Sequence, residues 1–367
     1  MRKNYLKYLR LFGCGLILMV SIASCKKDSS GPPPGPKAAT PIGTIGLYEL
    51  DSSVYRRVFI PIAKVGTQTV NSLSVFDTGS TGMTIDATGI LPASMITANG
   101  ITVPGDSVVV NGITVTPTQA VVSFGSVGHG TQEFGNLAYA SVTIGDGHGM
   151  ITTGRIPIFL YYKVIDVATN KQLPAHTNDV FGVAPGVSFA RNLIGSPLSY
   201  FKTTNGLTSG FKLAMFNSAA FGANATYVPG LLTVGLVPSD LTSAGFIMHT
   251  LLAGPLGGDS PEIAATITYN GKVDQAEVLF DTGTPAVTII EDPSVKNSVT
   301  LLPGSVVSIS TSSGFTYQYT TSASDNLTQV NSPSFTGDPR TIFSIDFFIE
   351  NEFLTDYANH RIGLKNN

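Results

Sequence analysis

Two stretches of this 367-residue chain repeat the same series of residues. Residues 74–85 read SVFDTGSTGMTI, and residues 278–289 read VLFDTGTPAVTI. In each copy an apolar run ends in Phe-Asp-Thr-Gly and a hydroxyl residue, and a Thr-Ile pair closes the stretch. The two aspartates, Asp77 and Asp281, lie 204 residues apart, which is about the length of one domain. The repeat therefore predicts two copies of one lobe, each contributing one aspartate.

The residues before each Asp-Thr-Gly also follow a shared pattern. Residues 58–79, VFIPIAKVGTQTVNSLSVFDTG, and residues 265–283, ATITYNGKVDQAEVLFDTG, both read as a strand, a turn, a second strand and a loop. We therefore expect each Asp-Thr-Gly to end a hairpin. We place a first lobe at 42–208 and a second lobe at 209–367, with the boundary in the segment TNGLTSG.

Composition favours strands over long charged helices. Hydrophobic residues make up 43% of the chain, which allows a sizeable core, whereas charged residues make up 12%, about half of the usual share of roughly 25%. Only residues 196–204 and 291–299 favour short helices. Tight hairpin turns are expected at Asn99-Gly100, Asn111-Gly112, Asp146-Gly147 and Asn270-Gly271. The pattern predicts an all-β fold of sandwich or barrel type.

The N-terminal segment 1–24 has the composition of a targeting sequence. It begins with basic residues, continues with the apolar run LFGCGLILMVSIAS and ends before Cys25 in IASC, which resembles a bacterial lipoprotein signal. The resemblance implies lipids on Cys25 and a place on the bacterial cell envelope, with the outer membrane as the expected location. An ordinary transmembrane anchor or a plain secretory peptide is the alternative, although the run is short for a membrane span. Residues 25–41 would then form the lipidated cysteine and a Pro/Gly-rich tether.

Charge and cysteine content exclude several classes of function. The net charge is −3, so a nucleic-acid partner is not expected. The only cysteines are Cys14 and Cys25, so the body of the chain has no disulfide and no thiol chemistry. The five histidines are scattered without a zinc-binding spacing, and no loop has a nucleotide-binding pattern, so we expect no metal ion and no cofactor.

The Asp-Thr-Gly loops suggest a specific chemistry. Glycine permits a positive backbone angle and lets its amide approach the carboxylate, and the hydroxyls of Ser80 and Thr284 offer a further hydrogen bond, unless they are simple turn residues. Two such loops brought together would place two carboxyls side by side, sharing one proton because both cannot easily ionise. One carboxyl would then act as a base and the other as an acid around a water molecule.

On these motifs the chain resembles the pepsin-like aspartic proteases. The resemblance rests on FDTGS at 76–80 and FDTGT at 280–284, and weaker similarity extends over most of residues 45–364. It implies an all-β, bilobal fold of two barrel-like lobes with a central cleft, and endopeptidase activity of a monomer on protein or peptide substrates. The site residues it implies are the catalytic Asp77 and Asp281, the supporting Thr78, Gly79, Ser80, Thr282, Gly283 and Thr284, the flap residues Phe124 and Gly125, and Phe181 and Gly182 in a loop beside the first aspartate.

The sequence departs from that family at two positions. The flap usually carries a tyrosine where this chain has Phe124, which keeps the ring but lacks the hydroxyl. In the second lobe the segment of two apolar residues and a glycine is matched by Ile342-Phe343-Ser344. Phe124 could instead be an ordinary strand aromatic, and His129 is read as an exposed histidine at the hairpin tip. These departures leave open a second hypothesis, a binding module that captures peptides or proteins without cutting them.

Overall fold

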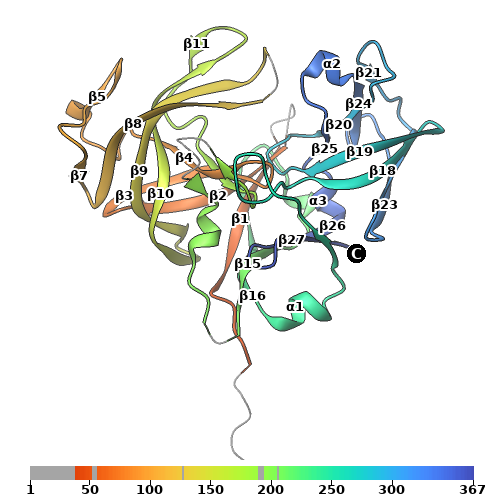
Figure 1. Ribbon diagram of the computed structural model, residues 1–367, viewed down its shortest axis with the longest axis horizontal. Coiled ribbons are helices and arrows are strands. Elements are labelled where there is room, and N and C mark those ends of the chain that lie inside the picture. The colour runs from red at the N-terminus through yellow and green to blue at the C-terminus, as the bar shows by residue number, and fades with distance from the viewer. Residues whose placement is uncertain (1–37, 52–55, 126–127, 189–193, 205) are drawn as a thin grey trace, which may run out of the picture. The chain divides into compact units, whose positions relative to one another are not determined.

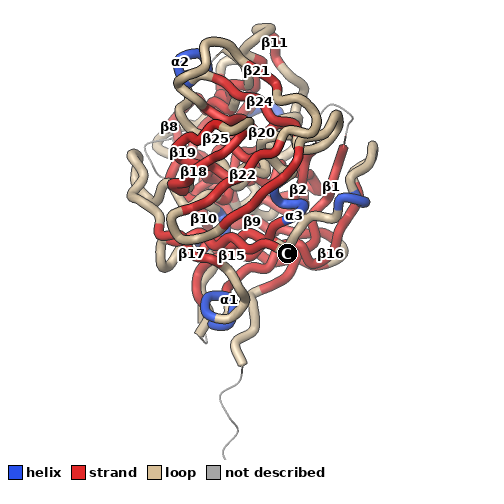
Figure 2. The backbone as a smooth tube through the Cα atoms, turned by 90° about the vertical axis from the view of Figure 1, so that its right-hand side faces the viewer, coloured by secondary structure: helices blue, strands red, loops and turns tan. Residues whose placement is uncertain are grey.

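Strands dominate the computed structural model, which describes residues 38–51, 56–125, 128–188, 194–204 and 206–367 (Figures 1 and 2). Residues 39–367 form one compact unit. The predicted signal segment, Cys25 and most of the tether lie outside the described residues, so those assignments stay predictions. In the described part of the chain, no helix has both the length and the apolar character needed to span a bilayer.

The larger of the two main sheets contains strands from both ends of the chain. Its order is β17-β27-β26-β15-β16-β1-β2-β3-β12-β4-β10-β9-β8-β7, with β11 paired to β10. The bounds are β1 (Gly43–Asp51), β2 (Arg56–Val65), β3 (Gln68–Asp77), β4 (Thr81–Asp86), β7 (Val108–Val110), β8 (Ile113–Phe124), β9 (Thr131–Asp146), β10 (Gly149–Asp166), β11 (Lys171–Gln172), β12 (Val180–Val183), β15 (Thr208–Leu213), β16 (Thr226–Leu236), β17 (Ile247–Thr250), β26 (Asn351–Asp356) and β27 (Arg361–Asn366). The predicted lobe boundary, near residue 208, falls at the first residue of β15, and the boundary itself stays a prediction.

The second main sheet comes entirely from the second half of the chain. Its order is β21-β24-β20-β25-β19-β18-β22-β23. The bounds are β18 (Ile263–Tyr269), β19 (Lys272–Phe280), β20 (Val287–Glu291), β21 (Val299–Thr300), β22 (Val306–Thr311), β23 (Thr316–Thr320), β24 (Leu327–Asn331) and β25 (Thr341–Phe343). We call residues 43–195 the first lobe and residues 263–350 the second lobe. Two small hairpins, β5 (Ile96–Thr97) with β6 (Gly100–Ile101) and β13 (Val187–Ser188) with β14 (Ile194–Gly195), belong to the first lobe.

The two hairpins that lead to the aspartates fold as the sequence predicts, whereas two of the four expected turns are shifted by one residue: Thr97 pairs with Gly100 and Asp146 pairs with Gly149, so the turns are Ala98-Asn99 and Gly147-His148. β2 pairs antiparallel with β3, and β18 pairs antiparallel with β19, so each Asp-Thr-Gly follows the second strand of a hairpin. Asn270 and Gly271 connect β18 to β19 with φ of 48° and 75°, which is the backbone that makes Asn-Gly a favoured two-residue turn. Asn111-Gly112 connects β7 to β8 in the same way, with φ of 52° and 72°.

Helices are few and short. They are α1 (Pro238–Thr242), α2 (Pro333–Thr336), α3 (Phe347–Glu350) and 3₁₀ turns at Ala93–Met95, Pro197–Tyr200 and Ser218–Ala220. The helix expected within 196–204 is present as the single turn Pro197–Tyr200, which begins after Ser196, whose hydroxyl accepts from the amide of Leu198. The helix expected within 291–299 is wrong. Asp292 instead accepts from the amide of Ser294 at 2.7 Å, which forms a local turn after β20.

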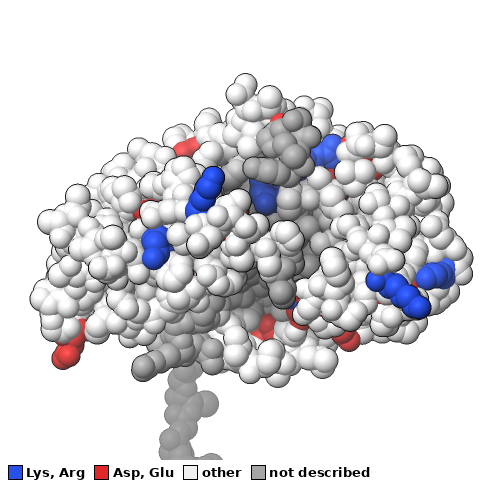
Figure 3. All heavy atoms as spheres, turned by 90° about the horizontal axis from the view of Figure 1, so that it is seen from above, with Lys and Arg blue, Asp and Glu red and all other residues white. Residues whose placement is uncertain are grey.

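Each lobe has an apolar interior, and the surface carries few charges. The large buried side chains include Phe76, Phe159 and Phe181 in the first lobe and Phe280 and Phe343 in the second. Figure 3 shows that charged side chains are sparse among the described residues of the face seen there, as expected for a chain with 12% charged residues. The buried ends of β3 and β19 thus carry their aspartates out of one continuous apolar core.

Candidate functional site

The first aspartate is positioned by three strands. Asp77 is the last residue of β3, and its neighbour Phe76 is fully buried. β12 lies beside β3 in parallel, with Phe181 opposite Phe76 and Gly182 opposite Asp77, and it also pairs with β4. The amide of Ala184 donates to the carbonyl of Ser80 at 2.8 Å, which ties β12 to the loop after Asp77. Phe181 and Gly182 therefore lie where the sequence comparison predicted, beside the first Asp-Thr-Gly loop.

The second aspartate is positioned in the same way. β25 lies parallel to β19, with Phe343 opposite Phe280, and the amide of Asp281 donates to the carbonyl of Phe343 at 2.9 Å. The amide of Ile345 donates to the carbonyl of Thr284 at 3.1 Å, a bond like the Ala184–Ser80 bond of the first lobe but shifted by one residue along the strand. The register makes Phe343 the counterpart of Phe181, so Ser344 stands at the position of Gly182.

The second lobe has room for the side chain of Ser344, whereas the first lobe has no room for a side chain at Gly182. A Cβ on Gly182 would lie 2.7 Å from the carbonyl oxygen of Ser80 and 2.8 Å from that of Gly82. In the second lobe, the buried Ser344 side chain instead lies 3.4 Å from the hydroxyl of Thr288, and its amide donates to that hydroxyl at 3.3 Å. The serine therefore belongs to a buried hydrogen-bonded pair.

The two threonines of the motifs join the lobes. The amide of Thr78 donates to Oγ1 of Thr282 at 3.0 Å, and the amide of Thr282 donates to Oγ1 of Thr78 at 3.0 Å. Each hydroxyl then donates to the strand that carries the other aspartate: Thr78 to the carbonyl of Phe280 at 2.8 Å, and Thr282 to the carbonyl of Phe76 at 2.6 Å. Both threonines are buried. This reciprocal threonine pair fixes the two loops against each other.

Each aspartate carboxylate accepts hydrogen bonds from its own loop. Oδ1 of Asp77 accepts from the amides of Gly79 at 2.8 Å and Ser80 at 3.1 Å, and Oδ2 accepts from the Ser80 hydroxyl at 2.6 Å. Oδ1 of Asp281 accepts from the amide of Gly283 at 2.7 Å, and Oδ2 accepts from the Thr284 hydroxyl at 2.6 Å. Ser80 and Thr284 therefore contact the carboxylates directly and are more than turn hydroxyls.

The glycines of the motifs have a different role from the one expected. Their amides do approach the carboxylates, but neither Gly79 nor Gly283 has a positive φ. A Cβ on Gly79 would instead lie 2.5 Å from Cγ of Asp281, and a Cβ on Gly283 would lie 2.7 Å from Cγ of Asp77. The glycines are needed because the opposite carboxyl occupies the space of their side chain. The two carboxyls are consequently side by side, each against the loop of the other lobe.

This arrangement sets the protonation of the pair. Burial raises the pKa of Asp77 above its ordinary range, and the charge of Asp281 and a hydrogen bond between the two side chains raise the pKa further. The hydroxyl of Ser80 and the amide of Gly79 oppose that shift by stabilising the ionised form. A pair of this kind holds one proton between two carboxyls, so one can accept a proton while the other donates one.

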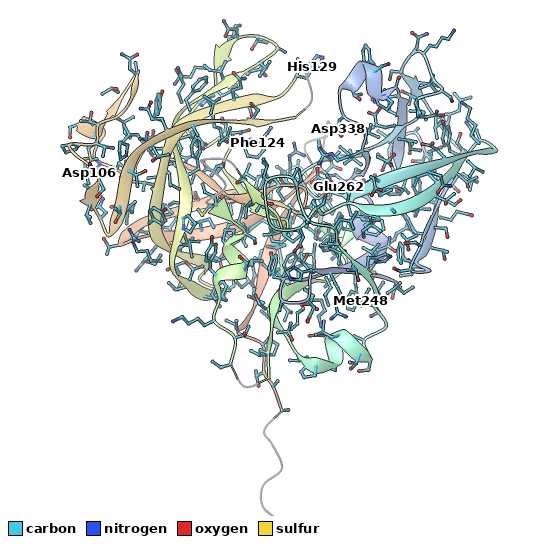
Figure 4. The ribbon with its side chains drawn as sticks, viewed as in Figure 1. Asp106, Phe124, His129, Met248, Glu262 and Asp338 are labelled. Atoms are coloured by element: carbon cyan, nitrogen blue, oxygen red, sulfur yellow. The ribbon has the colours of Figure 1, made fainter. Side chains whose placement is uncertain are left out.

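The predicted flap hairpin is formed by β8 and β9. Phe124 ends β8 opposite Thr131, and the exposed His129 lies in the turn beyond it (Figure 4). The Phe124 ring packs against an apolar cluster that includes Val122 and Tyr161. Gly125 has φ of 94°, and a Cβ there would lie 2.8 Å from Cα of Gly130. Within the described residues, no hydrogen bond joins this hairpin to either aspartate, so its part in a site stays a prediction.

Two features near the loops were not anticipated from the sequence. Arg57 of β2 donates through Nη1 to the carbonyl of Gly283 at 2.8 Å, across the lobes. Behind β4, the buried Glu133 of β9 accepts from Asn178 at 2.6 Å and from Thr84 at 3.3 Å. The signal for Arg57 was an Arg-Arg pair at the start of a strand in a chain with few charges. Glu133 gave no signal, because a glutamate in an alternating strand is usually exposed.

The described surface has no other obvious candidate site. Two hollows, of about 450 and 570 Å³, lie in the second half of the chain, and neither is lined by a residue of the Asp-Thr-Gly loops. Among the residues that the structure describes, no three His, Cys, Asp or Glu side chains are grouped as a metal ion would require.

Comparison with solved structures identifies the fold. The aspartic proteinase from Irpex lacteus matches 89% of this chain and 97% of its own chain, with a TM-score of 0.53 and 15% sequence identity. The chain has the bilobal pepsin-like fold. Basic 7S globulin from soybean matches 89% of this chain and 96% of its own chain, with a TM-score of 0.56 and 13% identity.

At the level of sequence, no protein-family model and no curated protein matches. The matches to solved structures confirm the predicted all-β, bilobal fold. Because their sequence identities are low, the activity has to be argued from the site itself.

Proposed function

We propose that the protein is an aspartic endopeptidase that hydrolyses peptide bonds with a water molecule activated by Asp77 and Asp281. The observation that carries the proposal is the mutual placement of the carboxyls. Each carboxyl occupies the space that a Cβ atom would need on the glycine of the opposite loop. Two aspartates held this way share a proton, and that is the state in which a carboxyl pair supplies both a base and an acid.

The proposed reaction uses only groups of this site and water. The ionised carboxyl takes a proton from water, whose oxygen attacks the carbonyl carbon of the peptide bond. The protonated carboxyl gives its proton to the carbonyl oxygen, so the tetrahedral intermediate is neutral. The carboxyl that took the proton from water then passes it to the departing nitrogen, the carbon–nitrogen bond breaks, and the second carboxyl recovers its proton from the intermediate. At the end one carboxyl is ionised and one is protonated, as at the start.

The supporting residues have defined parts in this proposal. Ser80 and Thr284 donate to Oδ2 of Asp77 and Oδ2 of Asp281 and hold the two carboxylates in place. Thr78 and Thr282 set the distance between the loops through their reciprocal bonds. Rigid placement of this kind accounts for a large part of the rate of reactions between positioned groups.

The test is cleavage of an unfolded protein by the detergent-solubilised full chain across a range of acidic to neutral pH, beside the variants Asp77→Asn and Asp106→Asn. Asp106 is an exposed aspartate at the far edge of the first lobe and serves as the matched control (Figure 4). We expect Asp77→Asn to lower the rate at least about 1,000-fold and Asp106→Asn to leave it unchanged. Undiminished cleavage by Asp77→Asn would refute the proposed mechanism.

A second candidate function is capture of peptides or proteins without cleavage. Two observations favour it. Phe124 has no hydroxyl to offer at the flap, and one of the similar structures bears the name of a globulin. Absence of cleavage by the folded wild type at every pH, together with binding of unfolded peptides, would favour this function over the peptidase.

We also propose that the protein is a lipid-anchored monomer of a bacterial cell envelope. The proposal rests on the basic and apolar segment before Cys25 and on the Pro/Gly-rich residues after it. Metabolic labelling with a radioactive fatty acid should mark the wild type and leave Cys25→Ala unlabelled. Label retained by Cys25→Ala would disprove lipidation at that cysteine.

A further inference from the structure

Two neighbouring arginines of the first lobe reach into the second lobe. Arg56 and Arg57 begin β2, the first strand of the hairpin that ends in Asp77. Arg56 forms ion pairs with Asp51 at 3.3 Å, Asp325 at 2.6 Å and Asp346 at 2.8 Å. Its guanidinium is therefore matched by three carboxylates. It ties β2 to the chain that follows β25 and has the character of a structural link.

Arg57 makes a different contact. Its Nη1 donates at 2.8 Å to the carbonyl oxygen of Gly283, a residue of the second Asp-Thr-Gly loop. The amide of the same glycine donates to Oδ1 of Asp281 at 2.7 Å. Gly283 is thus held from both sides: its N–H aligns the aspartate, and its carbonyl is fixed by a charged donor from the other lobe. A hydrogen bond from a charged donor is stronger than one between neutral groups.

The two loops differ in the number of backbone hydrogen bonds that their aspartate carboxylates accept. In the first loop, the amides of both Gly79 and Ser80 donate to the Asp77 carboxylate. In the second loop, the amide of Thr284 donates at 3.3 Å to the backbone carbonyl of Asp281 and not to its carboxylate. The Asp281 carboxylate therefore receives one backbone hydrogen bond where the Asp77 carboxylate receives two. The cross-lobe bond from Arg57 supports the loop that has fewer bonds of its own.

We propose that Arg57 is a positioning residue for Asp281: it holds Gly283 so that the Gly283 amide and the Asp281 carboxylate stay aligned beside Asp77. Its role in turnover rests on the proposed peptidase function, whereas its effect on the loop does not. Arg57 does not contact the reacting atoms in this account. It acts through Gly283, so its loss should lower the rate of the chemical step and leave substrate binding largely unchanged.

The kinetic test uses the full chain and three variants. We expect Arg57→Gln to lower kcat about 10- to 100-fold, the usual consequence of a small misplacement of a reacting group, with KM changed less than about threefold. Arg57→Lys keeps a charged donor and should recover most of the lost kcat. Arg361→Gln is the control, because Arg361 pairs with the buried Asp356 at 2.7 Å, far along the chain from either loop. It should lower stability and leave kcat of the folded protein unchanged.

A second measurement does not depend on turnover. Crystal structures of the two variants should differ in the second Asp-Thr-Gly loop. The Gly283 amide should move away from Asp281 in Arg57→Gln and keep its hydrogen bond to Asp281 in Arg361→Gln. An unmoved Gly283 in Arg57→Gln, a kcat within twofold of wild type, or a lysine variant as impaired as the glutamine variant would each overturn the proposal. A wild type that never cleaves, combined with a displaced Gly283, would end the peptidase proposal and leave the positioning role standing.

Discussion

Replacing Glu133 by glutamine should make the free energy of unfolding less dependent on pH. Glu133 lies on β9, the second strand of the predicted flap hairpin, and its side chain is fully buried. Oε1 accepts from Asn178 and Thr84, whereas Oε2 has no hydrogen-bond partner among the described residues. Burial raises the pKa of Glu133 to about 8, the two hydrogen bonds lower it, and the nearby charges of Asp179 and Asp86 raise it. Glutamine has the same shape and keeps the acceptor oxygen, but it cannot ionise.

The size of the effect follows from the two pKa values. The ordinary value of 4.5 applies to the unfolded chain and about 8 to the folded chain, so the stabilisation is complete below pH 4.5 and is lost as the pH rises toward 8. In that window the folded state holds a proton that the unfolded state releases. Each pH unit then lowers the free energy of unfolding by about 1.4 kcal/mol, which gives about 2.5 kcal/mol between pH 5 and pH 7. Glu133→Gln should be free of this loss.

The assay is urea denaturation of wild type and Glu133→Gln at pH 5, 6 and 7. Glu277→Gln, a change at an exposed glutamate of β19, is the control. The stability of Glu133→Gln relative to wild type should rise steadily from pH 5 to pH 7, while that of the control should stay constant. A difference between Glu133→Gln and wild type that varies by less than about 0.5 kcal/mol over this range would refute the reasoning.

The remaining predictions concern the strands beside the two Asp-Thr-Gly loops and the histidine at position 176. Gly182→Ala should lower stability by about 2 kcal/mol or more, because the added Cβ collides with the carbonyl of Ser80. Ser344→Gly, at the matching position of the second lobe, should cost only about 1 kcal/mol. Equal urea midpoints for the two variants would contradict this. A hydrogen bond with Asp179 raises the pKa of His176 to about 9, against the opposing effect of burial. The stabilisation is therefore complete below pH 6.5 and lost as the pH rises to 9. His176→Asn tolerates the positive φ at that position and should cost roughly 1 kcal/mol at pH 6, after allowance for partial exposure, and almost nothing at pH 9.5. Thermal melts showing the same loss at both pH values would exclude this role.

The parts of the fold that depend on local sequence could be predicted. Asn270-Gly271 and Asn111-Gly112 form hairpin turns because few other dipeptides accept two consecutive positive φ angles. The Asp-Thr-Gly repeats indicated paired loops, since the same local pattern occurred twice after an apolar strand. The helix expected within 291–299 failed because Asp292 can close a turn with its own side chain, and this competes with a helix in so short a segment.

The parts that depend on contacts between distant residues could not be predicted. Gly79 looked like a glycine needed for its backbone angle, and only the structure shows that the carboxyl of Asp281 takes its side-chain space. Arg57 and Gly283 are 226 residues apart. Glu133 follows the spacing of an ordinary strand residue, and its burial depends on how β4 and β9 pack. Without an alignment of related sequences, a single chain carries no record of such distant pairs.

The reciprocal threonine pair has a consequence for when this protein becomes active. The hydrogen bonds of Thr78 and Thr282 described above all cross to the opposite lobe. A lobe folded alone would therefore leave its threonine amide, and the carbonyl just before its aspartate, without these hydrogen-bond partners. An unfolded or half-folded chain carries two separate, ordinary aspartates. Under the proposed function, the chain would gain its hydrolytic activity only after both lobes have folded and joined. The hydrolytic activity would then be absent from a nascent chain and from any partly folded form in which the two loops are apart.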